Sequence, residues 1–171
     1  RKALEAARIA RRRLHWRGGV AVAETSDAFE VVKQAGKIRH YGGSNLDLAD
    51  MEEWWKASGG NAVAANQLLF NLTRRGIEFD LLPWMQERKV PVMAYSPLEQ
   101  ARLVNDSKLS AVARKHGMTP ARAALAWLLA RDDGIVIPKS AWAERRRENS
   151  GAHDHPLGGL RVAGPGGWFQ P

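Results

Sequence analysis

The sequence predicts an α/β protein built around a parallel β-sheet. Five short runs have the length of β-strands, at residues 12–14, 38–41, 62–65, 90–95 and 135–137. Segments with helical periodicity separate them, at intervals near the roughly 30 residues of a strand-helix-strand unit. The runs are largely continuous in apolar residues, as expected for strands covered on both faces. Polar residues follow each run, and this repetition is the main functional clue in the chain.

The first strand-like run is the least apolar of the five. Residues 1–10 can form a helix, and a strand is expected over residues 12–14. Arg11, Arg12 and Arg13 would place three guanidinium groups in this strand. Because an unpaired buried charge is costly, each group is expected to reach solvent or an acidic partner.

Capping residues mark the helix boundaries. Glu24-Thr25-Ser26 is expected to begin a helix that ends at Gly36. Asp47 and Asp50 have the spacing of a capping box, and Thr119-Pro120 has the character of an N-cap followed by a first-turn proline. Further helices are predicted from about residue 78, from Asn105-Asp106-Ser107 and over residues 143–149.

The alternation ends near residue 149. Residues 150–171 contain 6 glycines and 3 prolines and show neither strand nor helix periodicity. This composition predicts an irregular tail. The expected organisation is therefore one structured unit over residues 1–149, followed by the tail.

Composition excludes several classes of protein. The net charge is +8 over 171 residues, but seven basic residues against Glu5 already give +6 in the first seventeen, so no nucleic-acid partner is expected. The absence of Cys excludes disulfides, thiolate catalysis and Cys-ligated metal sites, and no metal site is predicted. No apolar run approaches the roughly 18 residues of a membrane span, so no membrane partner and a cytoplasmic location are expected.

The polar residues at the strand ends belong to five short motifs. These are Leu14-His15-Trp16; Gly36-Lys37-Ile38-Arg39 with Gly42-Gly43-Ser44-Asn45; Asn66-Gln67; Ala94-Tyr95-Ser96-Pro97-Leu98; and Ile137-Pro138-Lys139-Ser140 with Arg145, Glu148 and Asn149. In this order, over most of residues 14–149, they resemble the successive motifs of the aldo-keto reductases. The resemblance implies a partial (β/α)8 TIM barrel with about five of the eight units, lacking the N-terminal strands.

The resemblance also implies NADPH as the cofactor and a small-molecule carbonyl compound, an aldehyde or ketone, as the substrate. Ser44, Asn45 and Gln67 would hydrogen-bond the nicotinamide carboxamide, which has both donors and acceptors. Tyr95 would stack on the nicotinamide ring. His15 would take the catalytic role of donating a hydrogen bond to the substrate carbonyl.

The remaining matched residues would bind the other end of the cofactor. Ser96 and Leu98 would lie along the pyrophosphate. Lys139, Ser140 and Arg145 would hold the adenosine 2′-phosphate, which favours NADPH over NADH. Glu148 and Asn149 would lie near the adenine.

Each role has a structural alternative. Ser44-Asn45 could cap the following helix, Tyr95 could be a core aromatic, and Lys139 and Arg145 could be solvated surface residues. His15 could be a structural histidine. The sequence alone leaves these alternatives open.

The proton donor has no candidate among the matched residues. In the family it is a tyrosine, tuned by a lysine and an aspartate, on earlier strands. The chain contains only Tyr41 and Tyr95, and both lie in motifs with other roles. Three functional interpretations follow: the cofactor-binding part of an NADPH-dependent reductase, a non-catalytic nicotinamide-nucleotide-binding regulatory module, or an inactive, unstable fragment. The sequence predicts neither the particular substrate nor the oligomeric state.

Overall fold

Five parallel strands form the sheet of the computed structural model, which describes residues 9–131 and 134–154. They are β1 (Ile9–Leu14), β2 (Ile38–Ser44), β3 (Val63–Leu69), β4 (Val92–Tyr95) and β5 (Ile135–Val136). The strands lie in chain order, each paired in parallel with the next. The prediction of an α/β protein with a parallel sheet is confirmed.

Helices connect and flank these strands. The α-helices are α1 (Val22–Gln34), α2 (Leu48–Lys56), α3 (Leu81–Glu87), α4 (Ser107–Lys115), α5 (Pro120–Leu129) and α6 (Ala143–Ser150). The short 3-10 helices are η2 (Gly60–Ala62), η3 (Gly76–Glu78), η4 (Leu103–Asn105) and η5 (Gly151–Asp154). Within the described ranges, no helix is long and apolar enough to cross a membrane.

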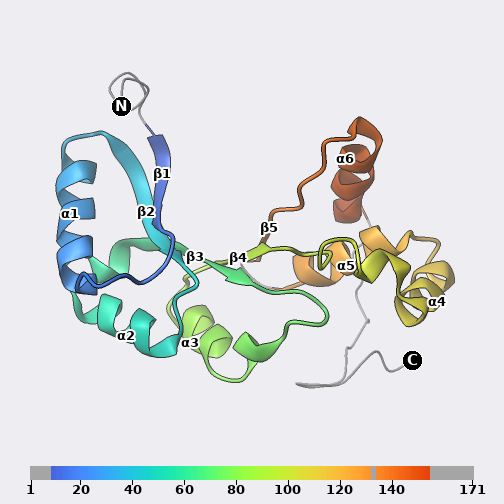
Figure 1. Cartoon of the computed structure of the whole chain (residues 1–171), viewed down its shortest axis with the longest axis horizontal. Coiled ribbons are helices and arrows are strands. Elements are labelled where there is room, and N and C mark those ends of the chain that lie inside the picture. The colour runs from blue at the N-terminus through green and yellow to red at the C-terminus, as the bar shows by residue number, and fades with distance from the viewer. Residues whose placement is uncertain (1–8, 132–133, 155–171) are drawn as a thin grey trace.

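The strand order determines which face of the sheet the helices cover. Consecutive strands are neighbours, and crossovers between parallel strands are right-handed, so successive crossovers fall on the same face. Figure 1 shows α1, α2 and α3 together on the outer side of a curved path of strands. Sequential strands with helices on one face are the arrangement of part of a (β/α)8 barrel.

Three predicted helix caps are confirmed. The side chains of Asp47, Asp106 and Thr119 each accept a hydrogen bond from the backbone N–H three residues further on, at the starts of α2, α4 and α5. Asp47 and Asp50 together form the predicted capping box. The helix expected from about residue 78 begins later, at Leu81, because the preceding residues form η3.

The start of α1 differs from the prediction. The helix begins at Val22, and its N-cap Ala21 has no side-chain capping bond. Ser26 lies inside the helix and is fully buried, where its Oγ donates to Ser58 O (2.7 Å) and accepts from Trp54 Nε1 (3.0 Å). The predicted N-cap at Glu24-Thr25-Ser26 is therefore wrong. The Ser26 hydroxyl bonds to residues distant in the sequence, whereas capping patterns consider only neighbouring residues.

The position of β1 at the edge of the sheet explains how it accommodates arginines. Arg11, Arg12 and Arg13 are all exposed, and Arg13 Nη1 lies 3.4 Å from Met93 Sδ of β4. The guanidinium groups therefore reach solvent, as predicted.

The helix predicted over residues 1–10 is wrong at its end, because Ile9 already pairs with Ile38 of β2. Residues 1–8 lie outside the described residues.

Strand β3 is longer than predicted. The sequence indicates a strand over residues 62–65, whereas β3 runs from Val63 to Leu69. Leu68 and Leu69 pair with Ala94 and Tyr95 of β4. This pairing with a neighbouring strand extends β3 toward the site.

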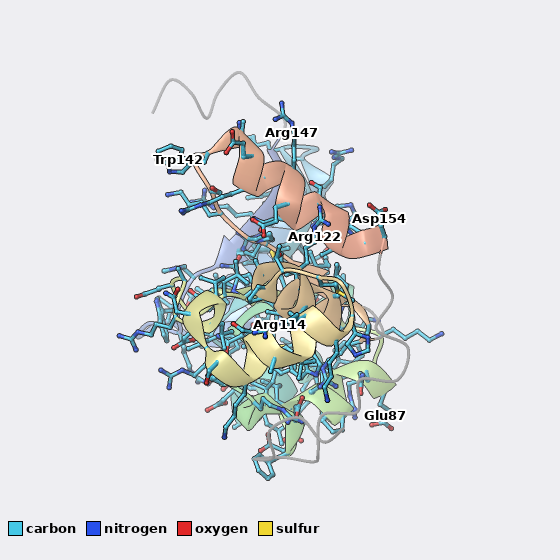
Figure 2. The ribbon with its side chains drawn as sticks, turned by 90° about the vertical axis from the view of Figure 1, so that its right-hand side faces the viewer. Glu87, Arg114, Arg122, Trp142, Arg147 and Asp154 are labelled. Atoms are coloured by element: carbon cyan, nitrogen blue, oxygen red, sulfur yellow. The ribbon has the colours of Figure 1, made fainter. Side chains whose placement is uncertain are left out.

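The segment after residue 149 begins as regular structure. Helix α6 ends at Ser150 and leads into η5, whose Ala152 is buried. Arg122 of α5 donates from Nε to Glu148 O (3.2 Å), and Figure 2 shows Arg122 close to α6. The first residues of the predicted tail are thus helical, and residues 155–171 lie outside the described residues.

A stack of aromatic rings joins α1, α2 and β2. Tyr41 is 1% exposed and stacks on Phe29 (centroids 5.3 Å apart) and on Trp54 (6.2 Å). Its Oη lies 2.5 Å from Glu30 Oε1 and 2.6 Å from Gly59 O. Burial is the main cause that raises the pKa of the Tyr41 hydroxyl, which therefore stays protonated.

Tyr41→Phe is expected to destabilise the fold by about 1 kcal/mol, because it removes the hydrogen bond of the hydroxyl but keeps the stacked ring. The hydrogen bond from Tyr41 is the main cause that lowers the pKa of Glu30. This contribution is therefore present above the ordinary carboxyl pKa and is lost as the pH falls through the lowered pKa. Urea unfolding of both proteins should show a difference that shrinks at acid pH. A difference independent of pH would contradict the role given to Glu30.

Candidate functional site

The carboxyl ends of β2, β3 and β4 bring together four of the predicted cofactor residues. Tyr95 Oη donates to Asn45 Oδ1 (2.9 Å), and Asn45 Nδ2 donates to Ser44 Oγ (3.2 Å). Gln67 O accepts from Ser44 Oγ (3.2 Å) and from Asn45 N (2.9 Å). Residues from three separate motifs are thus joined by direct hydrogen bonds. We refer to Ser44, Asn45, Gln67 and Tyr95 as the strand-end cluster.

The backbone of Asn45 directs its side chain toward Tyr95. Its φ is +58°, in the left-handed region that asparagine adopts more readily than most residues. Ser44 lies beneath it and is fully buried. The alternative that Ser44-Asn45 caps the next helix is wrong, because Asp47 is the N-cap of α2.

Gln67 has a polar atom that the protein leaves without a hydrogen bond. Its Oε1 is buried and lacks a hydrogen-bond partner. Leaving a buried acceptor unpaired costs about 1–3 kcal/mol, so such an atom calls for an explanation. A ligand that donates a hydrogen bond at the strand-end cluster would provide one.

The other predicted cofactor residues line a pocket of about 610 Å³. Its wall includes Ser96, Leu98, Lys139, Ser140, Arg145, Glu148 and Asn149, which are all seven of the residues expected at the pyrophosphate and adenosine end. A volume of this size is typical of small-molecule sites. Ser96 of the pocket wall directly follows Tyr95 of the strand-end cluster in the chain.

The cations of the pocket are available to a ligand. Lys139 and Arg145 are exposed. In the described part of the chain, neither side chain takes part in an ion pair with an acidic residue. The guanidinium of Arg145 lies 5.9 Å from the ring centroid of Trp142. The site therefore combines two unneutralised positive charges with a concave wall, which suits an anionic ligand.

The loop after β4 has an unusual backbone that the sequence did not reveal. Ser96, Glu99, Gln100 and Ala101 have φ values of +49°, +47°, +53° and +69°. None is glycine, and each left-handed residue costs about 1–2 kcal/mol. Contacts from elsewhere must hold this loop in place. They come from Asn71, which no motif singled out.

His15 reaches the strand-end cluster through its backbone. His15 O accepts a hydrogen bond from Asn45 Nδ2 (3.3 Å). Its imidazole is exposed and lies 6.1 Å, centroid to centroid, from the ring of Trp16. The structure thus brings His15 next to the cluster, with the side chain on the solvent side.

Comparison with known proteins identifies the family. The Aldo/keto reductase family model matches residues 3–159. The chain belongs to the aldo/keto reductase family. The resemblance given by the five motifs is confirmed.

This chain spans a little over half the length of the relatives named here. It is 42% identical to methylglyoxal reductase YeaE of Escherichia coli (strain K12), over 88% of this chain and 55% of the relative. It is 32% identical to glyoxal reductase of Bacillus subtilis (strain 168), over 84% of this chain and 51% of the relative. A crystal structure of an aldo-keto reductase from Klebsiella pneumoniae in complex with NADPH matches with a TM-score of 0.87 and 41% identity, over 92% of this chain and 57% of that one.

Both tyrosines of this aldo/keto reductase have hydrogen-bond partners. Tyr95 donates to Asn45, and Tyr41 lies in the helix-facing stack, bonded to Glu30 and Gly59. The Tyr41 hydroxyl thus bonds to Glu30 and Gly59 rather than to the strand-end cluster. The expectation that neither tyrosine serves as the proton donor is consistent with these positions.

Proposed function

We propose that this aldo/keto reductase chain binds NADPH along its strand ends and contributes this cofactor site to the reduction of a small aldehyde or ketone. The observation that carries the proposal is the 610 Å³ pocket that holds Lys139 and Arg145, whose wall includes Ser96, the residue directly after Tyr95 of the strand-end cluster. The relatives named above support it, since one is a complex with NADPH and two are reductases of glyoxal or methylglyoxal. A compact dicarbonyl such as methylglyoxal is the proposed substrate.

The strand-end cluster fits the nicotinamide end of the cofactor. A carboxamide offers both donors and acceptors, and the unpaired Gln67 Oε1 would accept from its amino group. Asn45 would bind the same group, with Ser44 supporting it from below. Tyr95 is half-buried at the end of β4, so part of its ring can face the cofactor.

The pocket fits the phosphate-bearing end. Lys139 and Arg145, with the hydroxyl of Ser140, would bind the 2′-phosphate by charge-assisted hydrogen bonds. Ser96 and Leu98 would line the path of the pyrophosphate, and Glu148 and Asn149 of α6 would lie beside the adenine.

When bound, NADPH supplies the hydride that reduces the carbonyl carbon. His15 is the proposed donor of a hydrogen bond to the carbonyl oxygen, because it lies beside Asn45 and its imidazole faces solvent. Neither tyrosine hydroxyl is free to donate the proton, so we expect this chain to bind NADPH without efficient turnover. The names of the relatives favour a reductase over a regulatory module that binds nucleotide without catalysis.

The limits and location of the unit are part of the same proposal. We propose that the structured unit extends beyond residue 149, at least to Asp154, because η5 follows α6 directly and buries Ala152. A cytoplasmic location is proposed from the cysteine-free sequence. No nucleic-acid partner is proposed, since the excess charge lies at one end of the sequence.

Binding of NADPH to the purified chain is expected to change the fluorescence of the nicotinamide, because Tyr95 and the strand-end cluster would shield the ring from water. A titration with the chain at fixed NADPH should saturate in the micromolar range. NADH, which lacks the 2′-phosphate, is the matched control and should bind more weakly. No response at high micromolar chain concentration would contradict the proposal. Rapid oxidation of NADPH after addition of methylglyoxal would contradict the expectation of inefficient turnover.

A further inference from the structure

The loop over residues 96–101 forms one wall of the proposed NADPH site without glycine to ease its turns. Ser96, Gln100 and Ala101 line the pocket, and all three have left-handed backbones. The backbone hydrogen bonds of the loop are local, from Glu99 N to Ser96 O (2.9 Å) and from Arg102 N to Glu99 O (3.0 Å). Such a conformation persists only where surrounding groups enforce it.

Asn71 is the central group that holds this loop. It is fully buried just after the end of β3. Its Nδ2 donates to Ser96 O (2.9 Å) and to Glu99 Oε2 (2.6 Å). Its Oδ1 accepts from Thr73 N (2.9 Å), Thr73 Oγ1 (2.8 Å) and Arg74 N (3.0 Å). The amide therefore uses its acceptor to order its own turn and its donors to fix the loop.

Glu99 completes the link from the loop side. Its Oε1 accepts from Arg74 Nε (3.0 Å) and lies 2.9 Å from Arg74 Nη2. The Glu99 side chain is 15% exposed, whereas that of Arg74 is 53% exposed. The two carboxylate oxygens are thus divided between Asn71 and Arg74. In a glutamine, the Nε2 amino group would replace one of these oxygens and face a donor of Asn71 or Arg74, so one of the two contacts would be lost.

We propose that Asn71, Arg74 and Glu99 form a latch that sets the shape of the 96–101 loop and so determines the affinity of the pocket for nucleotide. The three are positioning residues, because they act through Ser96, Gln100 and Ala101 and do not touch the ligand themselves. The effect on nucleotide affinity rests on the proposed function. The effect on the loop itself does not, so the two can be measured separately.

Hydrogen exchange of the full chain without nucleotide tests the latch. In Glu99→Gln, amides of residues 96–103 are expected to exchange at least about fivefold faster than in the original chain, because the loop opens more often. Glu87→Gln is the matched control. Glu87 is the last residue of α3, its carboxylate pairs with Arg88 and is 74% exposed, and Figure 2 shows it far from α6. Unchanged exchange in Glu99→Gln would overturn the latch.

NADP⁺ binding by the same variants tests the link to the pocket. Glu99→Gln is expected to raise the dissociation constant about tenfold, and Glu87→Gln to leave it unchanged. Faster exchange with an unchanged dissociation constant would overturn the link to affinity. If the original chain binds no NADP⁺, the proposed function fails and the link to affinity fails with it, while the exchange data still decide the latch.

Arg74→Lys and Arg74→Ala keep the test informative if Glu99→Gln fails to fold. Arg74 is half-exposed, so its replacement removes no buried side chain, and Glu99 keeps its hydrogen bond from Asn71. Lysine keeps the cation and should retain part of the protection of the loop, whereas alanine should lose it. Equal exchange in the two variants and the original chain would overturn the contribution of Arg74.

Discussion

Trp54→Ala is expected to lower the free energy of unfolding by about 3–5 kcal/mol, the range for truncating a buried aromatic side chain. Trp54 is fully buried and packs against both Phe29 (6.1 Å, 15°) and Tyr41 (6.2 Å, 6°). Its Nε1 also donates to Ser26 Oγ (3.0 Å), inside α1. The substitution would leave a cavity where α1, α2 and β2 meet. A loss of this size is a large part of the stability of a typical domain.

Urea unfolding followed by far-UV circular dichroism measures this loss without relying on tryptophan fluorescence. Trp142→Ala is the matched control, because Trp142 is 68% exposed and lies at the start of α6, labelled in Figure 2. It should change the free energy of unfolding by less than about 0.5 kcal/mol. Equal effects of the two substitutions would show that the aromatic stack is not the centre of the core.

Replacing both Lys139 and Arg145 by alanine is expected to weaken NADPH binding roughly 100-fold and NADH binding only slightly. A charge-assisted hydrogen bond contributes about 1.5–3 kcal/mol, so loss of two can account for a factor of this size. Both side chains line the 610 Å³ pocket, and in the described residues neither forms an ion pair with an acidic side chain. Their charge is therefore available for the 2′-phosphate.

Titration of each variant with both nucleotides measures this preference directly. Arg114→Ala is the control for loss of a positive charge, since Arg114 lies on α4, as Figure 2 shows, and is absent from the pocket wall. It should keep the preference for NADPH. A double variant that still prefers NADPH by the original ratio would refute the assignment of the 2′-phosphate to Lys139 and Arg145.

The open sheet edges bear on the interpretation of the chain as an unstable fragment. Strands β1 and β5 each have one neighbour in the described sheet, and an open edge invites pairing with another strand. The buried core nevertheless extends from β2 to α5 and includes Tyr41, Met85, Leu109 and Leu125 at 1% exposure or less. The Trp54 and Tyr41 variants measure how much stability this core provides.

The sequence by itself determined the order and type of most elements. Asp47, Asp106 and Thr119 cap helices because their hydroxyl or carboxylate groups reach N–H groups only three residues away. The strand-end motifs likewise indicated which side chains would meet at one edge, since parallel strands direct their carboxyl ends the same way. These inferences succeeded because their causes lie within a few residues or follow from the parallel topology.

Tertiary structure alone decided the position of Ser26 within a helix and the shape of the loop at the pocket. Ser26 pairs with Ser58 and Trp54, about 30 residues away, so a residue suited to a cap lies within a helix. Asn71 holds Glu99 across 28 residues of chain, and no local pattern marks either of them. The conformation of the pocket loop depends on that contact, because four left-handed residues without glycine have no local reason to adopt it. The sequence predicted which groups would form the site, whereas packing between distant segments set the shape of its wall.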